Sequence, residues 1–257
     1  MKSIKTIKLL ALLFLVITAF TFTSCNDDDD DSTPIVNTHD DAYADVLLKK
    51  MNTSMGIRYK EIFFAGGVDI VPGESKVTTP DGTEYTLVEF WAGAGKVQNV
   101  MAPMSAEKMD AGDYTFTLKF TDGYEKTMID TLEDVELGLA MPFTVEYVSG
   151  DDHMTINWTL VPDADLLCVK ITEIDPVTGM PKDAKPYFKK SQLPADATSL
   201  IINFDGAEGW MRPVSELETG SNYFLSVAAK KVEAGAEISG ASQDFQTSSC
   251  VKTIFVY

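Results

Sequence analysis

Apolar and polar positions alternate over short segments along most of the chain from residue 57 onward. The clearest case is Gly112–Phe120, where aromatic and aliphatic side chains take every second position and Thr, Asp or Lys takes the others. A period of two predicts a strand with one buried and one solvent-facing side. Turn residues at 121–124 then predict a hairpin into 125–129. The apolar positions of the first strand are Tyr114, Phe116, Leu118 and Phe120.

Other segments show the same alternation and are bounded by turn residues, as at Pro80-Asp81-Gly82-Thr83. Turn signals recur about every 8 to 12 residues, a spacing typical of a β-sandwich. The segment 38–51 is ambiguous, because Thr38 and Asp41 fit a helix cap while its apolar positions fit an entering strand nearly as well. The further predicted strands are 57–64, 84–91, 155–159, 167–171, 199–204 and 223–229.

These elements predict an all-β fold built from two tandem β-sandwich domains of the immunoglobulin or fibronectin type III kind. The pattern changes near Leu137 to Pro142, where we place the boundary between them. The predicted organisation is a signal at 1–24, an acidic linker at 25–40, an N-terminal sandwich at 41–140 and a second sandwich at 141–257.

The second predicted domain carries a more specific pattern. Leu217, Gly220 and Tyr223 are spaced by three residues each and lead into an alternating strand, and Trp158 lies in an earlier strand. This pattern resembles the tyrosine corner and second-strand tryptophan of fibronectin type III domains. The resemblance implies that the Tyr223 hydroxyl bonds to the backbone and that Trp158 is a core residue. The long connections at 175–197 and 205–214 depart from that family.

The same resemblance bears on the cysteines. It implies that Cys168 lies on the third strand of the domain and Cys250 on the last, with the sixth strand between them. Two strand spacings are about 9–10 Å, which exceeds the reach of a disulfide. We therefore expect no Cys168–Cys250 bond.

The N-terminus is organised around Cys25. Three lysines precede an apolar run of about 14 residues, too short for the ~20 of a spanning helix, and small residues lead to Cys25. This arrangement resembles a bacterial lipoprotein signal, which implies that Cys25 is lipidated and becomes the first mature residue. An uncleaved membrane anchor is the alternative interpretation.

Asn26 and then an acidic run, Asp27–Asp31, follow Cys25. It resembles the signal that sends some Gram-negative lipoproteins to the exterior of the outer membrane. A solvated tether is the alternative, because five like charges repel and stay extended. We expect an outer-membrane protein facing the cell exterior, with the periplasmic side as the alternative.

Charge and residue chemistry exclude several function classes. The formal charge is −18, and −21 once the three signal lysines are removed, so nucleic acid is not an expected partner and membrane attachment depends on the lipid. His39 lies in the predicted linker and His153 in a predicted turn, so neither suits a catalytic triad. The acidic pairs Asp151-Asp152 and Asp163/Asp165 do not converge. We therefore expect no enzyme activity, no catalytic residue, no metal site and no cofactor.

Sugar binding is the more serious prediction. Trp91 and Trp210 lie among glycines at loop-like positions, and Glu208 and Arg212 flank Trp210. Surface lipoproteins of this architecture resemble the glycan-capturing components of utilisation systems, which implies a polysaccharide ligand and an outer-membrane transporter complex as partner. Alternatively, each tryptophan plugs the end of its sandwich. The competing function is a structural or adhesive surface protein whose sandwiches contact other proteins.

Overall fold

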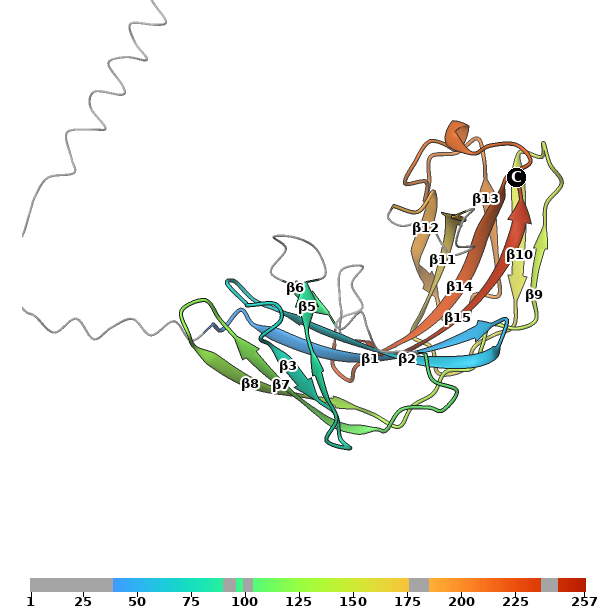
Figure 1. The fold of residues 1–257 in the computed structure, drawn as a ribbon. Helices are drawn as coiled ribbons and strands as arrows, with labels where there is room; N and C mark the ends of the chain where they lie inside the picture. Colours follow the sequence, from blue (N-terminus) through green and yellow to red (C-terminus); the bar gives the residue numbers. More distant parts are fainter. Residues whose placement is uncertain (1–38, 90–95, 99–103, 176–184, 237–244) are drawn as a thin grey trace, which may run out of the picture. The chain divides into compact units, whose positions relative to one another are not determined.

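The computed structural model describes residues 39–89, 96–98, 104–175, 185–236 and 245–257, with the backbone alone at 96–98. These residues belong to one compact unit, His39–Tyr257 (Figure 1). The predicted signal, Cys25 and the acidic run lie outside the described residues, so lipidation and export stay predictions. Within the described ranges, no helix has the length and apolar character needed to cross a bilayer.

Among the residues that the structure describes, strands account for nearly all of the regular structure, and one 3₁₀ turn lies at Val214–Glu216. The prediction of an all-β fold made of sandwiches is confirmed. In the N-terminal half the strands are β1 (Tyr43–Thr53), β2 (Gly56–Gly66), β3 (Lys76–Thr78), β4 (Glu84–Thr86), β5 (Val88–Glu89), β6 (Lys96–Gln98), β7 (Gly112–Lys119) and β8 (Glu125–Leu132). In the C-terminal half they are β9 (Phe143–Glu146), β10 (His153–Trp158), β11 (Leu166–Glu173), β12 (Phe188–Pro194), β13 (Ser199–Asn203), β14 (Asn222–Val232) and β15 (Phe245–Val256).

The N-terminal strands enclose one buried cluster. Side chains of β1 and β2, in the larger sheet, pack against those of the four-stranded sheet β4-β3-β7-β8. The alternation that predicted β7 is confirmed, because Tyr114, Phe116 and Leu118 are fully buried while the intervening threonines are half-buried. The predicted hairpin is also confirmed, with β7 and β8 pairing from Gly112–Leu132 to Lys119–Glu125.

The C-terminal strands enclose a second buried cluster between β13-β10-β9 and β12-β11-β14-β15. This is the strand order of a fibronectin type III-like sandwich. The predicted corner is present: the Glu218 N–H donates to the Tyr223 hydroxyl at 2.8 Å, and Leu217 is buried beside it. Trp158 is a core residue whose indole N–H donates to the Ala197 carbonyl at 2.8 Å.

The cysteine argument is confirmed by the register. Cys168 on β11 and Cys250 on β15 both lie opposite Ala228 of β14, so a whole strand separates them. Both thiols are free and buried.

A parallel pairing joins the two halves, and the sequence did not predict it. β1 pairs with β15 from Leu48–Thr247 to Met51–Cys250, which makes one eight-stranded sheet in the order β12-β11-β14-β15-β1-β2-β6-β5. The predicted division into domains at residue 140 is not tested by this arrangement and stays a prediction.

One open alternative is settled and two local expectations need correction. In the ambiguous segment 38–51, residues 43–51 belong to strand β1, which pairs with both β2 and β15, so the strand alternative is confirmed there. The single strand expected at 84–91 is divided at the buried Leu87, with β4 in one sheet and β5 in the other. His39 is not a flexible linker residue: it is 2% exposed, stacks on Phe120 at 3.7 Å and lies 3.0 Å from Asp122 Oδ2.

Candidate functional site

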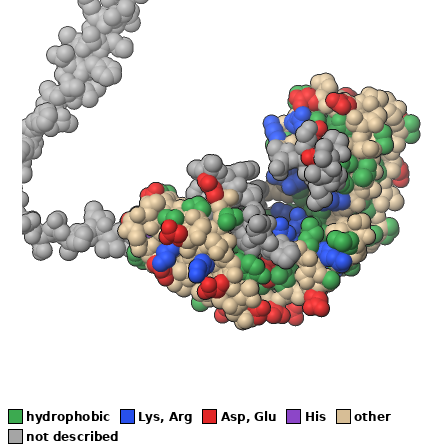
Figure 2. Space-filling view, in the orientation of Figure 1, with side chains coloured by type: hydrophobic (Ala, Val, Ile, Leu, Met, Phe, Trp, Pro, Cys, Tyr) green, Lys and Arg blue, Asp and Glu red, His purple; other side chains and the backbone are tan. Residues whose placement is uncertain are grey.

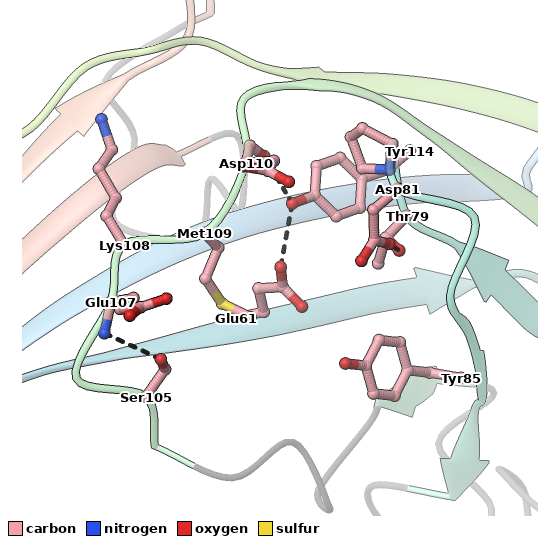
Figure 3. A pocket seen from close by; sticks show the side chains of 11 residues that line it. Glu61, Thr79, Asp81, Tyr85, Ser105, Glu107, Lys108, Met109, Asp110 and Tyr114 are labelled. Atoms are coloured by element: carbon pink, nitrogen blue, oxygen red, sulfur yellow. Dashed lines mark hydrogen bonds between the residues drawn. The ribbon is translucent and has the colours of Figure 1, made fainter.

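A polar pocket of about 220 Å³ opens on the N-terminal sandwich (Figure 3). We call it the Glu61 pocket. Segments far apart in the chain line it: β2, the β3–β4 turn, β4, β7 and the stretch 105–110 that precedes β7. Its lining residues are Glu61, Thr79, Pro80, Asp81, Tyr85, Ser105, Glu107, Lys108, Met109, Asp110 and Tyr114.

Glu61 lies at the bottom of this pocket, with only 3% of its surface exposed. Glu61 lies two residues before the buried Phe63 on β2, and residues two apart on a strand face the same side, so the Glu61 side chain points inward. Burial raises the pKa of Glu61 to about 7, with the charges of Asp81 and Asp110 adding to the shift and the Tyr114 hydrogen bond opposing it. Glu61 is thus a carboxyl group that changes charge near neutral pH.

The Tyr114 hydroxyl lies 3.0 Å from Glu61 Oε1 and 2.9 Å from the carbonyl oxygen of Asp110. One hydroxyl hydrogen serves only one of these acceptors at a time. When Glu61 is protonated, its O–H donates to Tyr114 Oη and the Tyr114 O–H donates to Asp110, so both contacts become hydrogen bonds. Tyr114 can thus serve either charge state of Glu61, and burial is the main cause of the raised pKa.

The second carboxyl oxygen of Glu61, Oε2, does not take part in this hydrogen-bond network. Oε2 is buried and has no hydrogen-bond partner among the described residues. Figure 3 shows the carboxyl group turned toward the space between Asp81 and Tyr85. A buried polar atom without a partner costs about 1–3 kcal/mol, so this oxygen is a natural contact for a ligand that donates a hydrogen bond.

Asp81, at the rim of the pocket, stabilises the β3–β4 turn. Its carboxylate accepts from the Thr83 N–H at 3.0 Å, from the Thr83 hydroxyl at 3.1 Å and from the Thr79 hydroxyl. These bonds, with that from Thr79 the strongest, hold the pKa of Asp81 below its usual value. Asp81 stays charged and fixed by the β3–β4 turn.

The remaining walls combine a ring with further polar groups. Burial raises the pKa of Tyr85, and the charges of Glu61 and Asp81 add to the shift. Lys108 is directed away from Glu61 in Figure 3 and pairs with Asp134. The pocket thus presents acceptors and an aromatic ring, with little positive charge.

The residues predicted as a sugar platform lie elsewhere. Trp210 is half-buried: its indole N–H donates to the Asn203 carbonyl at 2.9 Å, and its ring packs on Phe188 and Phe204. Glu208 pairs with Lys190. These side chains come from one stretch beside β12, and their role in ligand binding stays a prediction.

Arg212 belongs to the same stretch. It pairs with Glu216 at 2.7 Å, and its guanidinium lies 3.8 Å above the Tyr187 ring. Trp91 lies outside the described residues. The roles of Trp91 and Trp210 as ligand platforms therefore stay predictions.

Sequence reasoning missed the Glu61 pocket. Alternation placed Tyr114 in the core, which is correct, but did not show that its hydroxyl reaches Glu61. A charged residue on the buried side of a strand is the one local signal, because Glu61 shares its side with the apolar Phe63.

A second acidic group lies on β1, β8 and the end of β14. Carboxylate oxygens of Asp45, Asp130 and Glu233 lie within 4.8 Å of one another, and Asp130 also accepts from the Val46 N–H at 2.6 Å. No function is assigned to this group.

Comparisons with known proteins give little beyond the fold. No protein-family model and no curated protein matches the sequence. A two-domain fibronectin type III segment of chicken tenascin aligns over 77% of this chain and 93% of its own, with 12% identity and a TM-score of 0.29. A tetra-tandem repeat from the extending region of a large adhesion protein aligns over 84% of this chain and 50% of its own, with 14% identity and a TM-score of 0.22. At these scores no property of either protein is transferred to this chain.

Proposed function

We propose that this protein is a non-catalytic binding protein, held at the outer surface of the outer membrane by a lipid on Cys25, that captures a neutral saccharide in the Glu61 pocket. The observation that carries the proposal is the buried Glu61 Oε2, which has no hydrogen-bond partner among the described residues and borders a polar pocket. Sugar hydroxyls supply the hydrogen-bond donors that this oxygen lacks.

The chemistry of the walls defines the ligand class. Asp81, Glu107 and Asp110 offer carboxylate oxygens that accept from hydroxyl groups, and Tyr85 offers a ring for the C–H face of a sugar. The same carboxylates repel a ligand that carries acid groups. A neutral saccharide fits better than a uronic or sialic acid.

Binding fits this pocket better than hydrolysis. A glycosidase needs one carboxyl group as acid and a second that is available as base or nucleophile. Glu61 has the raised pKa of an acid, but Asp81 is already engaged by Thr79 and Thr83, and in this proposal Glu107 and Asp110 accept hydrogen bonds from the ligand and do not act as base or nucleophile. We therefore expect a bound oligosaccharide to be recovered uncleaved.

Affinity electrophoresis and calorimetry with neutral and acidic polysaccharides test this function. We expect a neutral member of the panel to bind, and Glu61→Met or Tyr85→Ala to weaken it by about 10-fold or more, the loss of one buried hydrogen bond or stacking contact. Tyr124→Ala, an exposed tyrosine outside the pocket, is the matched control. Absence of binding to every neutral glycan, or equal affinities for all variants, would contradict the proposal.

A structural or adhesive role is the second candidate. The continuous eight-stranded sheet supports it, because strands shared between the two sandwiches make a stiff spacer. Retention of a specific surface protein by the wild type, undiminished by Glu61→Met, together with no glycan binding, would favour this role.

A further inference from the structure

Lysines gather on one side of the eight-stranded sheet. Lys170 on β11 lies opposite Lys189 on β12 and Ser226 on β14, and Ser226 lies opposite Lys252 on β15. Directly opposite residues in neighbouring strands direct their side chains to the same side of a sheet. These residues therefore form one row across the sheet.

A second row runs parallel to the first. Lys230 on β14 lies opposite Ser248 on β15, Ser248 pairs with Lys49 on β1, and Lys49 lies opposite Lys60 on β2. Ser226 and Lys230 are separated by an even number of residues along β14, so both rows share one side. We call this surface the lysine face; its members are Lys49, Lys60, Lys170, Lys189, Lys230 and Lys252.

The lysine face is turned away from the C-terminal core. Leu167, Val169 and Ile171 on β11 alternate with Cys168 and Lys170 and belong to that core. Between the two rows runs a third, in which Cys168, Ala228, Cys250 and Met51 lead to Arg58 on β2. Blue side chains gather near the middle of the view in Figure 2, beside the strands of this sheet.

The arrangement is electrostatically unfavourable on its own. Like charges placed directly opposite in a sheet destabilise it, and the pairs Lys170–Lys189 and Lys49–Lys60 are of this kind. Among the described residues, none of the six lysines makes an ion pair with a carboxylate, although the chain as a whole carries −18.

The lysines also act on one another. Burial lowers the pKa of Lys49, and the charges of Lys252, Lys170 and Lys60 add to the shift while Cys250 opposes it. Burial lowers the pKa of Lys230 too, with Lys170, Lys189 and Lys49 adding to it against Cys168. An anion placed among these ammonium groups would relieve this repulsion.

We propose that the lysine face binds an anionic polysaccharide, one with carboxylate or sulfate groups along its chain. The face spans the strands from β12 to β2, about 24 Å at the usual spacing between strands, which is long enough for several sugar units and too long for a single lipid headgroup. This proposal is independent of the Glu61 pocket, which lies on the N-terminal sandwich and takes a neutral ligand.

Nucleic acid fits the face less well. Single strands are held by open aromatic rings on which bases stack. The rings near these lysines lie under ammonium groups instead: Lys230 Nζ is 3.9 Å from the centre of Phe245, and Lys252 Nζ is 5.8 Å from that of Phe224. A surface that offers positive charge but no open rings for stacking suits a polyanion without bases.

Calorimetry and salt titration of the mature chain with alginate, dextran sulfate and neutral dextran test the proposal. The test variant is Lys170→Gln/Lys252→Gln, since both lysines are exposed. The control is Lys76→Gln/Lys119→Gln, which removes the same charge from the N-terminal sandwich. We expect alginate or dextran sulfate, but not dextran, to bind, the test variant to lose about 10-fold or more in affinity, and its salt slope to fall by about two.

Each other outcome overturns the proposal. The proposal is wrong if neither alginate nor dextran sulfate binds at 50 mM salt. It is also wrong if the control variant loses as much affinity as the test variant, because binding would then depend only on the total charge of the protein. Single-stranded DNA or phosphatidylglycerol vesicles that bind as tightly, through the same two lysines, would refute the polysaccharide assignment. Circular dichroism checks that both variants fold, and Glu61→Met, which removes the pocket oxygen, should leave alginate affinity unchanged.

Discussion

At the scale of single residues, Glu61 holds a carboxyl group almost out of water with Tyr114 as its hydrogen-bonding neighbour. Such a group is tolerated because protonation removes the charge that burial penalises. Its carboxyl group therefore links the stability of the N-terminal sandwich to pH, and the sign of that link follows from the direction of the pKa shift.

The folded pKa of about 7 lies above the ordinary value of 4.5 for a glutamate side chain, so the folded state binds the proton more tightly. The stabilisation is complete below the unfolded pKa and is lost as pH rises through about 7. We expect the unfolding free energy of the wild type to fall by about 3 kcal/mol between pH 4.5 and 8 relative to Glu61→Gln. Urea unfolding across this range checks it; parallel pH profiles for both proteins would contradict it.

At the scale of elements, local pattern predicted the strands that carry their own signal. β7 and the Phe120 that follows it carry four alternating apolar positions before a turn. The Leu217–Tyr223 spacing identifies the corner before β14. The β1–β15 pairing left no such signal, because it joins residues far apart in the chain whose parallel register no turn specifies. The Glu61 pocket was missed for the same reason: its walls come from separate segments that only the fold brings together.

The connection 205–214 departs from the family that the second domain resembles, and part of it pairs with the chain beside β12. The Lys189 N–H donates to the Gly209 carbonyl at 2.8 Å, and the Met211 N–H donates to Tyr187 at 2.8 Å. Gly209 has φ +81°, and a Cβ there would lie 2.5 Å from the buried Phe188 ring. Only glycine satisfies both conditions.

We therefore expect Gly209→Ala to destabilise the fold by about 2–4 kcal/mol, from backbone strain and overpacking together. Gly206→Ala in the same stretch is the matched control, because its nearest neighbours lie at 3.8 and 3.9 Å and its φ is not positive. Chemical denaturation compares the two. Equal midpoints would show that the stretch is not packed against β12 as described.

At the scale of the whole molecule, the parallel pairing of β1 with β15 makes one eight-stranded sheet that contributes to both buried cores. β1 and β2 bury Val46, Leu48 and Phe63 in the N-terminal cluster, while β14 and β15 bury Leu225 and Val251 in the C-terminal one. If one sandwich unfolds, the edge strand of the other loses its hydrogen-bonded neighbour across the β1–β15 pairing. Domains joined only by a linker can unfold separately, whereas this shared pairing couples the unfolding of the two halves.

We predict a single calorimetric unfolding transition for the mature chain. Phe116→Ala in the N-terminal core and Ile171→Ala in the C-terminal core should each cost about 3–5 kcal/mol and lower the same transition. Ile129→Ala, a side chain that is 64% exposed, should leave it within about 0.5 kcal/mol of the wild type. Two resolved peaks, each moved by only one core variant, would show that the halves unfold independently.

The parallel pairing of β1 with β15 also affects how the protein responds to force. The predicted tether reaches the described fold at His39, so a pull on the chain from the membrane enters through β1. β1 runs parallel to β15, with their register extending from Leu48–Thr247 to Met51–Cys250. Tension along β1 loads these cross-strand hydrogen bonds together in shear and not one after another as in a zipper. A force on the segment before His39 therefore meets the junction between the sandwiches in the direction in which these hydrogen bonds resist together.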